Sequence, residues 1–131
     1  IDDVSKLMTN SVSCTSVFTQ IAGIEALEGP QDFVRNMMKE FTKRREIVVD
    51  GLNSLQGIKC SIPKGAFYAF PNIKNTGMSS QQFADKALYD GGVALLSGTS
   101  FGKFGEGFIR ISFANSIENI KEGIKRISTI L

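Results

Sequence analysis

Apolar residues recur every three or four positions along several stretches of this sequence, a spacing that is typical of amphipathic helices. The pattern predicts one helix over residues 16–28, a long one over 30–55 and a shorter one over 79–89. It also predicts a final helix that follows Asn115. Residues 1–15 are polar and rich in Ser, Thr and Asn, so we expect irregular backbone there.

The starts and ends of these helices have their own signals. Ser79 with Gln82 three residues later has the spacing of a capping box, in which each side chain bonds to the other's backbone. Asn115 with Glu118 has the same spacing and is expected to cap the last helix. Gly57 suits the turn that ends the long helix, because glycine readily adopts the left-handed conformation found there.

Alternating apolar and polar residues, or short apolar runs, predict four β-strands between these helices. The predicted strands cover residues 58–62, 66–70, 93–96 and 108–113, and a glycine-rich loop over 97–107 precedes the last of them. Strands and helices interleaved in this way imply an α+β fold. We expect a small, mostly antiparallel sheet with helices packed on one face.

The composition favours a folded chain without a nucleic-acid or membrane partner. Ten Phe residues suit the core that a chain of 131 residues can bury. Fifteen Lys and Arg against thirteen Asp and Glu give a net charge of +2, too balanced for a nucleic-acid footprint. No apolar run approaches the roughly 18 residues of a membrane span, and the acidic N-terminus is unlike a signal peptide. We therefore expect a cytoplasmic protein with reduced cysteines.

Few residues of this chain could carry out bond-making chemistry. The absence of histidine excludes His-based triads and His metal sites. Cys14 and Cys60 match no metal-ligand spacing. Lys64 and Lys103 stand in loops without the apolar surroundings that a Schiff-base lysine needs. The sequence offers elements for binding but no nucleophile, base or metal-ligand set.

Arg110 is the strongest candidate for a binding residue. Alternation along the last strand places Arg110 on one face with Phe108 and Ser112, and the expected core residues on the other. A guanidinium fork could there hold a carboxylate with two hydrogen bonds. An exposed strand arginine without a ligand is the alternative. The glycine-rich loop could bring backbone close to the same ligand, or could simply be a flexible connection.

Five segments, in this order, resemble the C-terminal third of class I aminotransferases. They read ALEGP, KRREIV, PKGAFYAFP, GVALLSGTSFG, and FIRISFA followed by SIEN. The similarity is to the aspartate and aromatic aminotransferase branch of the pyridoxal-phosphate enzymes of fold type I. It covers the chain from about Ser11 to the end.

The resemblance implies part of an enzyme that transfers an amino group between an amino acid and a 2-oxo acid. Arg110 matches the family arginine that holds the substrate α-carboxylate, and residues 98–102 resemble the loop that closes over the substrate. The polar stretch from Ser11 to Thr15 resembles a segment near the cofactor phosphate, too loosely to assign a residue. The family lysine that carries pyridoxal 5′-phosphate would lie before Ile1. No residue of this chain is therefore expected to be catalytic, to bind the cofactor or to ligate a metal.

The resemblance also predicts how the chain is organised. Residues 1–28 would be the last segment of the large cofactor-binding domain, and residues 29–131 the small domain, with the helix over 30–55 linking the two. The intact enzyme would be a homodimer, and the isolated chain would be inactive. Two other interpretations stay open: a free-standing α+β module that binds a carboxylate or regulates another protein, and a purely structural oligomerisation domain.

Overall fold

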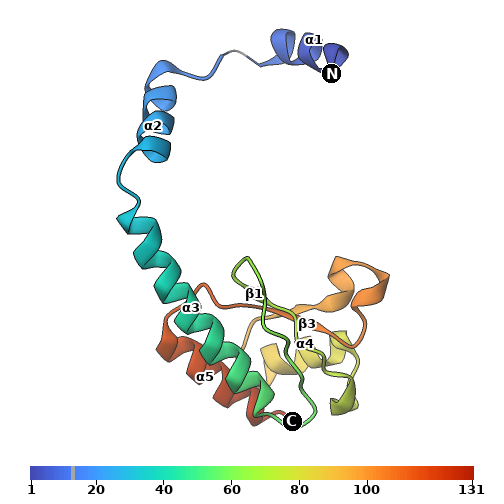
Figure 1. The fold of residues 1–131 in the computed structure, drawn as a ribbon. Helices are drawn as coiled ribbons and strands as arrows, with labels where there is room; N and C mark the ends of the chain where they lie inside the picture. The colour runs from blue at the N-terminus through green and yellow to red at the C-terminus, as the bar shows by residue number, and fades with distance from the viewer. Residues whose placement is uncertain (13) are drawn as a thin grey trace. The chain divides into compact units, whose positions relative to one another are not determined.

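The computed structural model describes residues 1–12 and 14–131 (Figure 1). The chain divides into two compact units, Ile1–Arg35 and Asn36–Leu131. The first unit contains α1 (Asp2–Ser11), α2 (Val17–Glu28) and the beginning of α3 (Asp32–Asn53). The second unit contains the rest of α3 and all the strands.

The irregular backbone expected over residues 1–15 is wrong for α1. Asp2 and Asp3 lie in its first turn, where negative charge is favourable beside the helix N-terminus. The Thr, Asn and Ser side chains that suggested a loop instead bond back to carbonyls four residues earlier: Thr9 to Ser5, Asn10 to Lys6 and Ser11 to Leu7. Ser13, within the same expected stretch, lies outside the described residues.

Helices and a small sheet alternate in the second unit, which confirms the α+β prediction. After α3 come β1 (Tyr68–Ala69), α4 (Ser80–Tyr89), β2 (Leu96–Ser97), β3 (Ile109–Ser112) and α5 (Ile117–Ser128). Three short 3₁₀ helices connect them: η1 (Lys74–Thr76), η2 (Gly98–Phe101) and η3 (Lys103–Gly105). The glycine-rich stretch is thus mostly two helical turns.

The sheet has the order β1-β3-β2, and both pairings are antiparallel. Its strands are shorter than the sequence pattern predicts. Residues 58–62 contribute only the bridge between Lys59 and Asn72. Val93 leaves the sheet because its N–H donates to the carbonyl of Ala87 at the end of α4. The alternation along β3 places Ile109 in the core and Arg110 on the opposite face, as predicted.

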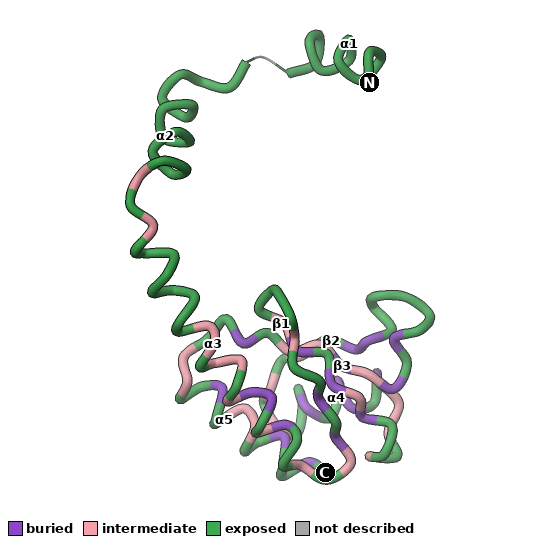
Figure 2. The backbone as a smooth tube through the Cα atoms, in the orientation of Figure 1, coloured by how far each residue is buried: buried purple, intermediate pink, exposed green. Residues whose placement is uncertain are grey.

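One face of the sheet, with the helices that cover it, makes the hydrophobic core. Figure 2 shows the buried positions of this core along the second half of α3 and in α4, α5 and β3. The core cluster includes Val48, Leu52, Ala69, Phe83, Ile109, Phe113, Ile120 and Ile127. Burial of side chains of this size contributes about 1.5–3 kcal/mol each to folding, so this face fixes which side of β3 points outward.

The apolar stripe predicted along residues 30–55 is buried over only part of its length. Val48, Val49 and Leu52 are buried, whereas Phe33 keeps 77% of its surface exposed. The helix also begins two residues later than predicted, at Asp32. Gly57 has a φ of 83° in the turn that follows the helix, as its position indicated.

The two predicted caps have different outcomes. Ser79 and Gln82 form the capping box of α4, with each side chain bonded to the other's backbone. Asn115 is not the cap of α5, because Ser116 takes that place and accepts from the N–H of Asn119. Asn115 instead accepts from the backbone N–H of Ser116 and from the side chain of Asn119.

Two helical glycines provide a matched test of the packing. A Cβ at Gly123 would meet no atom within 4 Å, whereas a Cβ at Gly51 would lie 2.5 Å from Cδ1 of Ile124. Gly123→Ala should therefore raise the free energy of unfolding by about 0.5–1 kcal/mol through helix propensity. Gly51→Ala should raise it less, because the side chain of Ile124 has to move to make room for the methyl group. Urea unfolding measures both, and equal shifts of the same sign would contradict the packing of α3 on α5.

The two cysteines should differ in reactivity. Cys60 is buried, and burial raises the pKa of its thiol, whereas Cys14 is exposed. The thiolate is the form that reacts, so iodoacetamide near pH 8 should label Cys14 first. Cys60 should be labelled only when the second unit unfolds locally or globally. In urea, where the chain is unfolded, Cys60 and Cys14 should be labelled at equal rates. Equal rates in the native chain, followed by mass spectrometry, would show that the core around Cys60 is open.

Candidate functional site

The guanidinium of Arg110 lies between two aromatic rings on the outer face of the sheet. Its Cζ is 4.3 Å from the ring centroid of Tyr68 and 4.0 Å from that of Phe101. Arg110 itself is half-buried. Cation–π contacts of this kind contribute about 0.5–2 kcal/mol each, and more as water is excluded. The two rings therefore restrict where the guanidinium can lie.

Three separate segments of the chain build this stack. In the sheet, Tyr68 lies opposite Ser112 and Leu96 lies opposite Arg110. Tyr68 and Arg110 are thus diagonal neighbours on the same face, within reach of a long side chain. Phe101 comes from the last residue of η2, in the glycine-rich stretch. The stack requires both the sheet register and the conformation of that stretch.

No acidic side chain of the described residues neutralises Arg110. The ion pairs between described residues are Arg35 with Asp32, Lys43 with Glu40, and Arg126 with Glu122. Stacking uses the faces of a guanidinium and leaves the N–H groups at its edge free to donate. Arg110 therefore presents a positive, oriented and unpaired fork, suited to a planar anion such as a carboxylate.

Further aromatic rings extend this surface, and we call Tyr68, Phe70, Phe101 and Phe108 the aromatic platform. Phe70 stacks on Phe108 with centroids 5.4 Å apart and meets Phe101 edge-on at 6.2 Å. The alternation of the strands indicated that Phe108 shares a face with Arg110. No local pattern indicated Phe101, which reaches the platform only through the fold of its loop.

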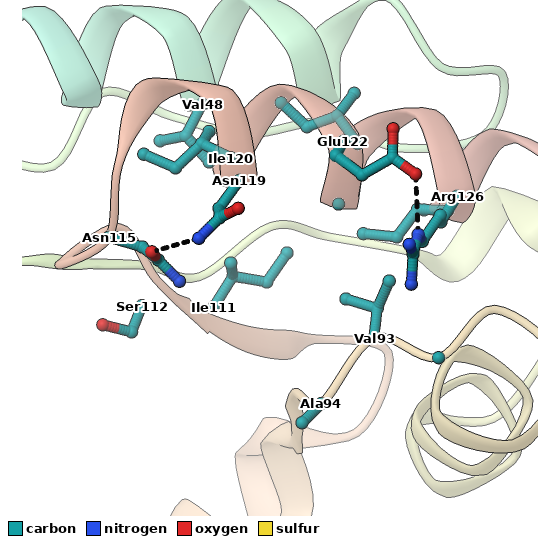
Figure 3. Close-up of a pocket in the computed structure, with 14 residues that line it drawn as sticks. Val48, Val93, Ala94, Ile111, Ser112, Asn115, Asn119, Ile120, Glu122 and Arg126 are labelled. Atoms are coloured by element: carbon teal, nitrogen blue, oxygen red, sulfur yellow. Dashed lines mark hydrogen bonds and ion pairs between the residues drawn. The ribbon is translucent and has the colours of Figure 1, made fainter.

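A cavity of about 360 Å³ lies elsewhere, between α5 and the segment before β2 (Figure 3). Its polar side chains are already paired: the side-chain amide of Asn119 donates to Asn115 at 2.9 Å, and Nε of Arg126 donates to Glu122 at 2.8 Å. Ile111, on the core face of β3, lines this cavity, and Arg110 does not. The cavity thus offers no unpaired charge for an anionic ligand.

A second cavity, of about 270 Å³, opens beside α3 and is mainly apolar. It is lined by Met37, Met38, Phe41, Thr42, Arg45, Pro63, Lys64, Gly65, Ala66, Phe67 and Phe113. Nη1 of Arg45 donates to the carbonyl of Pro63 at 3.4 Å, a long contact. Phe67 lines this cavity and packs on Phe41 with ring centroids 6.3 Å apart.

The residues of this chain do not fit the covalent attachment of pyridoxal 5′-phosphate. Every lysine is exposed, including Lys64 and Lys103, so none has the enclosed surroundings that would activate its amine. Nζ of Lys103 lies 5.0 Å from the ring centroid of Phe104, which is itself exposed. The described residues also contain no cluster of three or more acidic or cysteine side chains that could hold a metal ion.

None of the helices in residues 1–12 and 14–131 combines the length and the apolar character needed to cross a membrane.

Arg110 and the aromatic platform are the features of the described residues with the clearest capacity to bind a ligand. They can bind and orient an anion, but they offer no group that would make or break a bond.

The sequence is similar to that of one family of known proteins. The family described as "Aminotransferase class I and II" matches residues 1–127. An aspartate aminotransferase of Pyrococcus horikoshii is 45% identical over 133 residues, covering 100% of this chain and 34% of that protein. An aromatic-amino-acid aminotransferase of Thermococcus litoralis is 34% identical over 133 residues, with the same coverage.

Solved structures give the same result for the fold. The crystal structure of an aromatic aminotransferase from Pyrococcus horikoshii superposes with a TM-score of 0.88 and 37% identity, covering 95% of this chain and 34% of that one. An aspartate aminotransferase from Rhizobium meliloti gives 0.85 and 35%, covering 94% and 33%. The chain therefore spans about a third of the length of the relatives it matches.

Proposed function

Because this chain belongs to the class I and II aminotransferase family, we propose that it is the C-terminal part of an enzyme that transfers amino groups. The reaction would move an amino group between an amino acid and a 2-oxo acid, with pyridoxal 5′-phosphate as cofactor. The relatives named above act on aspartate or aromatic amino acids by their names. Residues outside these 131 would hold the cofactor, since the lysines of this chain are all exposed.

Arg110 would bind the α-carboxylate that amino acids and 2-oxo acids share. The observation that supports this role is its unpaired guanidinium, held at 4.3 Å and 4.0 Å between the rings of Tyr68 and Phe101. A carboxylate in the plane of that fork would accept two charge-assisted hydrogen bonds, each contributing about 1.5–3 kcal/mol. Arg110 would thus position the substrate without making a bond itself.

Residues 1–28 would belong to the large domain and residues 29–131 to the small domain. In support, neither α1 nor α2 has a buried residue. Phe18 keeps 78% and Leu27 84% of its surface exposed, and apolar surface on this scale normally marks an interface. The intact protein would be a cytoplasmic homodimer that binds neither nucleic acid nor membrane.

Replacing Arg110 tests the proposed function in the full-length parent enzyme. Arg110→Leu should lower kcat/KM toward any accepted amino acid by at least about a hundredfold, because the carboxylate loses its bidentate partner. Arg110→Lys should restore only part of the activity, since an ammonium lacks the planar fork. The melting temperature should fall by only a few degrees, because Arg110 lies outside the core and the substitution removes only its two cation–π contacts.

Arg126→Leu serves as the control for this experiment. It removes an arginine from the exposed face of α5, where the partner of Arg126 is Glu122. Its kcat/KM should stay within threefold of the unmodified enzyme. If Arg110→Leu also stays within threefold, Arg110 is not the residue that binds the carboxylate.

The domain assignment predicts that the 131-residue chain associates with itself. With no large domain to cover them, the apolar side chains of α2 should drive concentration-dependent assembly, measured by sedimentation. The double substitution Ile21→Ser and Ile24→Ser should reduce this assembly, because both side chains are exposed on α2. Glu25→Ser, on the same helix, should not. A monomer at all concentrations, with residues 1–28 ordered, would contradict the assignment.

A further inference from the structure

Ser80 is a fully buried polar residue, with 0% of its surface exposed, at the first position of α4. Its hydroxyl accepts from the backbone N–H of Gly107 at 2.8 Å and of Phe108 at 3.1 Å. The same hydroxyl donates to the carbonyl of Gly105 at 3.2 Å. One side chain thus bonds to three backbone groups about 25 residues further along the chain.

Glu106 completes this connection from the other side. Its Oε1 accepts from the backbone N–H of Ser80 at 2.9 Å. That N–H belongs to the first turn of α4, where helix geometry leaves amide donors without a partner and favours negative charge. We call Ser80 and Glu106 together the loop clip, because they fasten residues 105–108 to the start of α4.

The fastened residues determine where Phe101 lies. A Cβ added to Gly98 would collide with the carbonyl oxygen of Gly105, and one added to Gly105 would collide with that of Gly98. The N–H of Gly98 also donates to the carbonyl of Phe108 at 2.9 Å. The end of η3 therefore holds the beginning of η2, and η2 carries Phe101 onto the guanidinium of Arg110.

We propose that Ser80 and Glu106 are positioning residues for Arg110. They keep the glycine-rich loop closed on itself, so that the ring of Phe101 stays against the guanidinium, which the ring of Tyr68 also contacts. Their importance for substrate binding rests on the proposed function of Arg110. Their effect on the orientation of Arg110 does not, and the two are measured separately.

The first experiment follows Arg110 by NMR in the 131-residue chain, at a concentration below that at which the chain assembles. In Ser80→Ala, the amide of Gly107 should exchange with solvent at least about tenfold faster, because its bonded acceptor is gone. The side-chain Nε–H resonance of Arg110, shifted by the two rings, should move toward the value of an unstacked arginine. An unchanged Arg110 resonance beside faster exchange at Gly107 would overturn the proposal.

Ser79→Ala is the matched control. This substitution removes the N-cap of the same helix and therefore also lowers the stability of the chain. The cap contacts of Ser79 stay within α4, however, and do not reach the glycine-rich loop. It should leave the Arg110 resonance in place. If both variants move that resonance equally, the effect is general destabilisation and the proposal fails. If Ser80→Ala does not fold, Glu106→Ala replaces it and should shift the Arg110 resonance in the same way. Glu106→Gln should shift the resonance less, because its amide oxygen can still accept from the N–H of Ser80.

The second experiment is a double-mutant cycle in the full-length parent enzyme. Ser80→Ala and Phe101→Leu should each raise KM for the amino-acid substrate by roughly three- to thirtyfold, the range of one cation–π contact, with a smaller change in kcat. If Ser80 acts through Phe101, the double variant should be no worse than Phe101→Leu alone. If the two substitutions instead raise KM independently, so that their effects multiply in the double variant, Ser80 does not act through Phe101 and the proposal is overturned. Should Arg110→Leu itself leave activity intact, the proposed function fails while the NMR result still decides the positioning role.

Discussion

The whole arrangement depends on the alternation of side chains along β3. Ile109 and Ile111 point to the helices, so Arg110 between them has to point away. A shift of one residue in the register would bury the charge of Arg110 in the core and expose Ile109, both strongly unfavourable. The core therefore does more than stabilise the second unit, because it also determines which way the side chain of Arg110 points.

Residues close together in the sequence were the easiest to predict. The capping box of Ser79 and Gln82 and the face assignment of Arg110 depend on spacings of two or three residues, and both are correct. The prediction of irregular backbone was wrong for α1. Ser, Thr and Asn side chains can stabilise a loop or bond back to carbonyls within a helix, and composition does not distinguish the two cases. The predicted cap of α5 was one residue too early, because Asn115 and Ser116 are adjacent and both residue types are good caps.

The parts that sequence could not supply are contacts between distant segments. Phe101 reaches Arg110 only after η2 and η3 fold against each other, and Ser80 meets Gly107 across 27 positions of sequence. A serine at the start of a helix suggests a cap and nothing more. The strand lengths also follow from tertiary geometry, as when Val93 bonds to the end of α4 rather than to β3.

The stack on Arg110 has a consequence for the entropy of ligand binding. A free arginine side chain carries about 2 kcal/mol of rotamer entropy, which a ligand would otherwise have to remove when it orders the fork. Held between Tyr68 and Phe101, the guanidinium loses that freedom when the chain folds. If a carboxylate binds there as proposed, it would meet a fork that is already oriented, so more of the hydrogen-bond energy would remain as affinity.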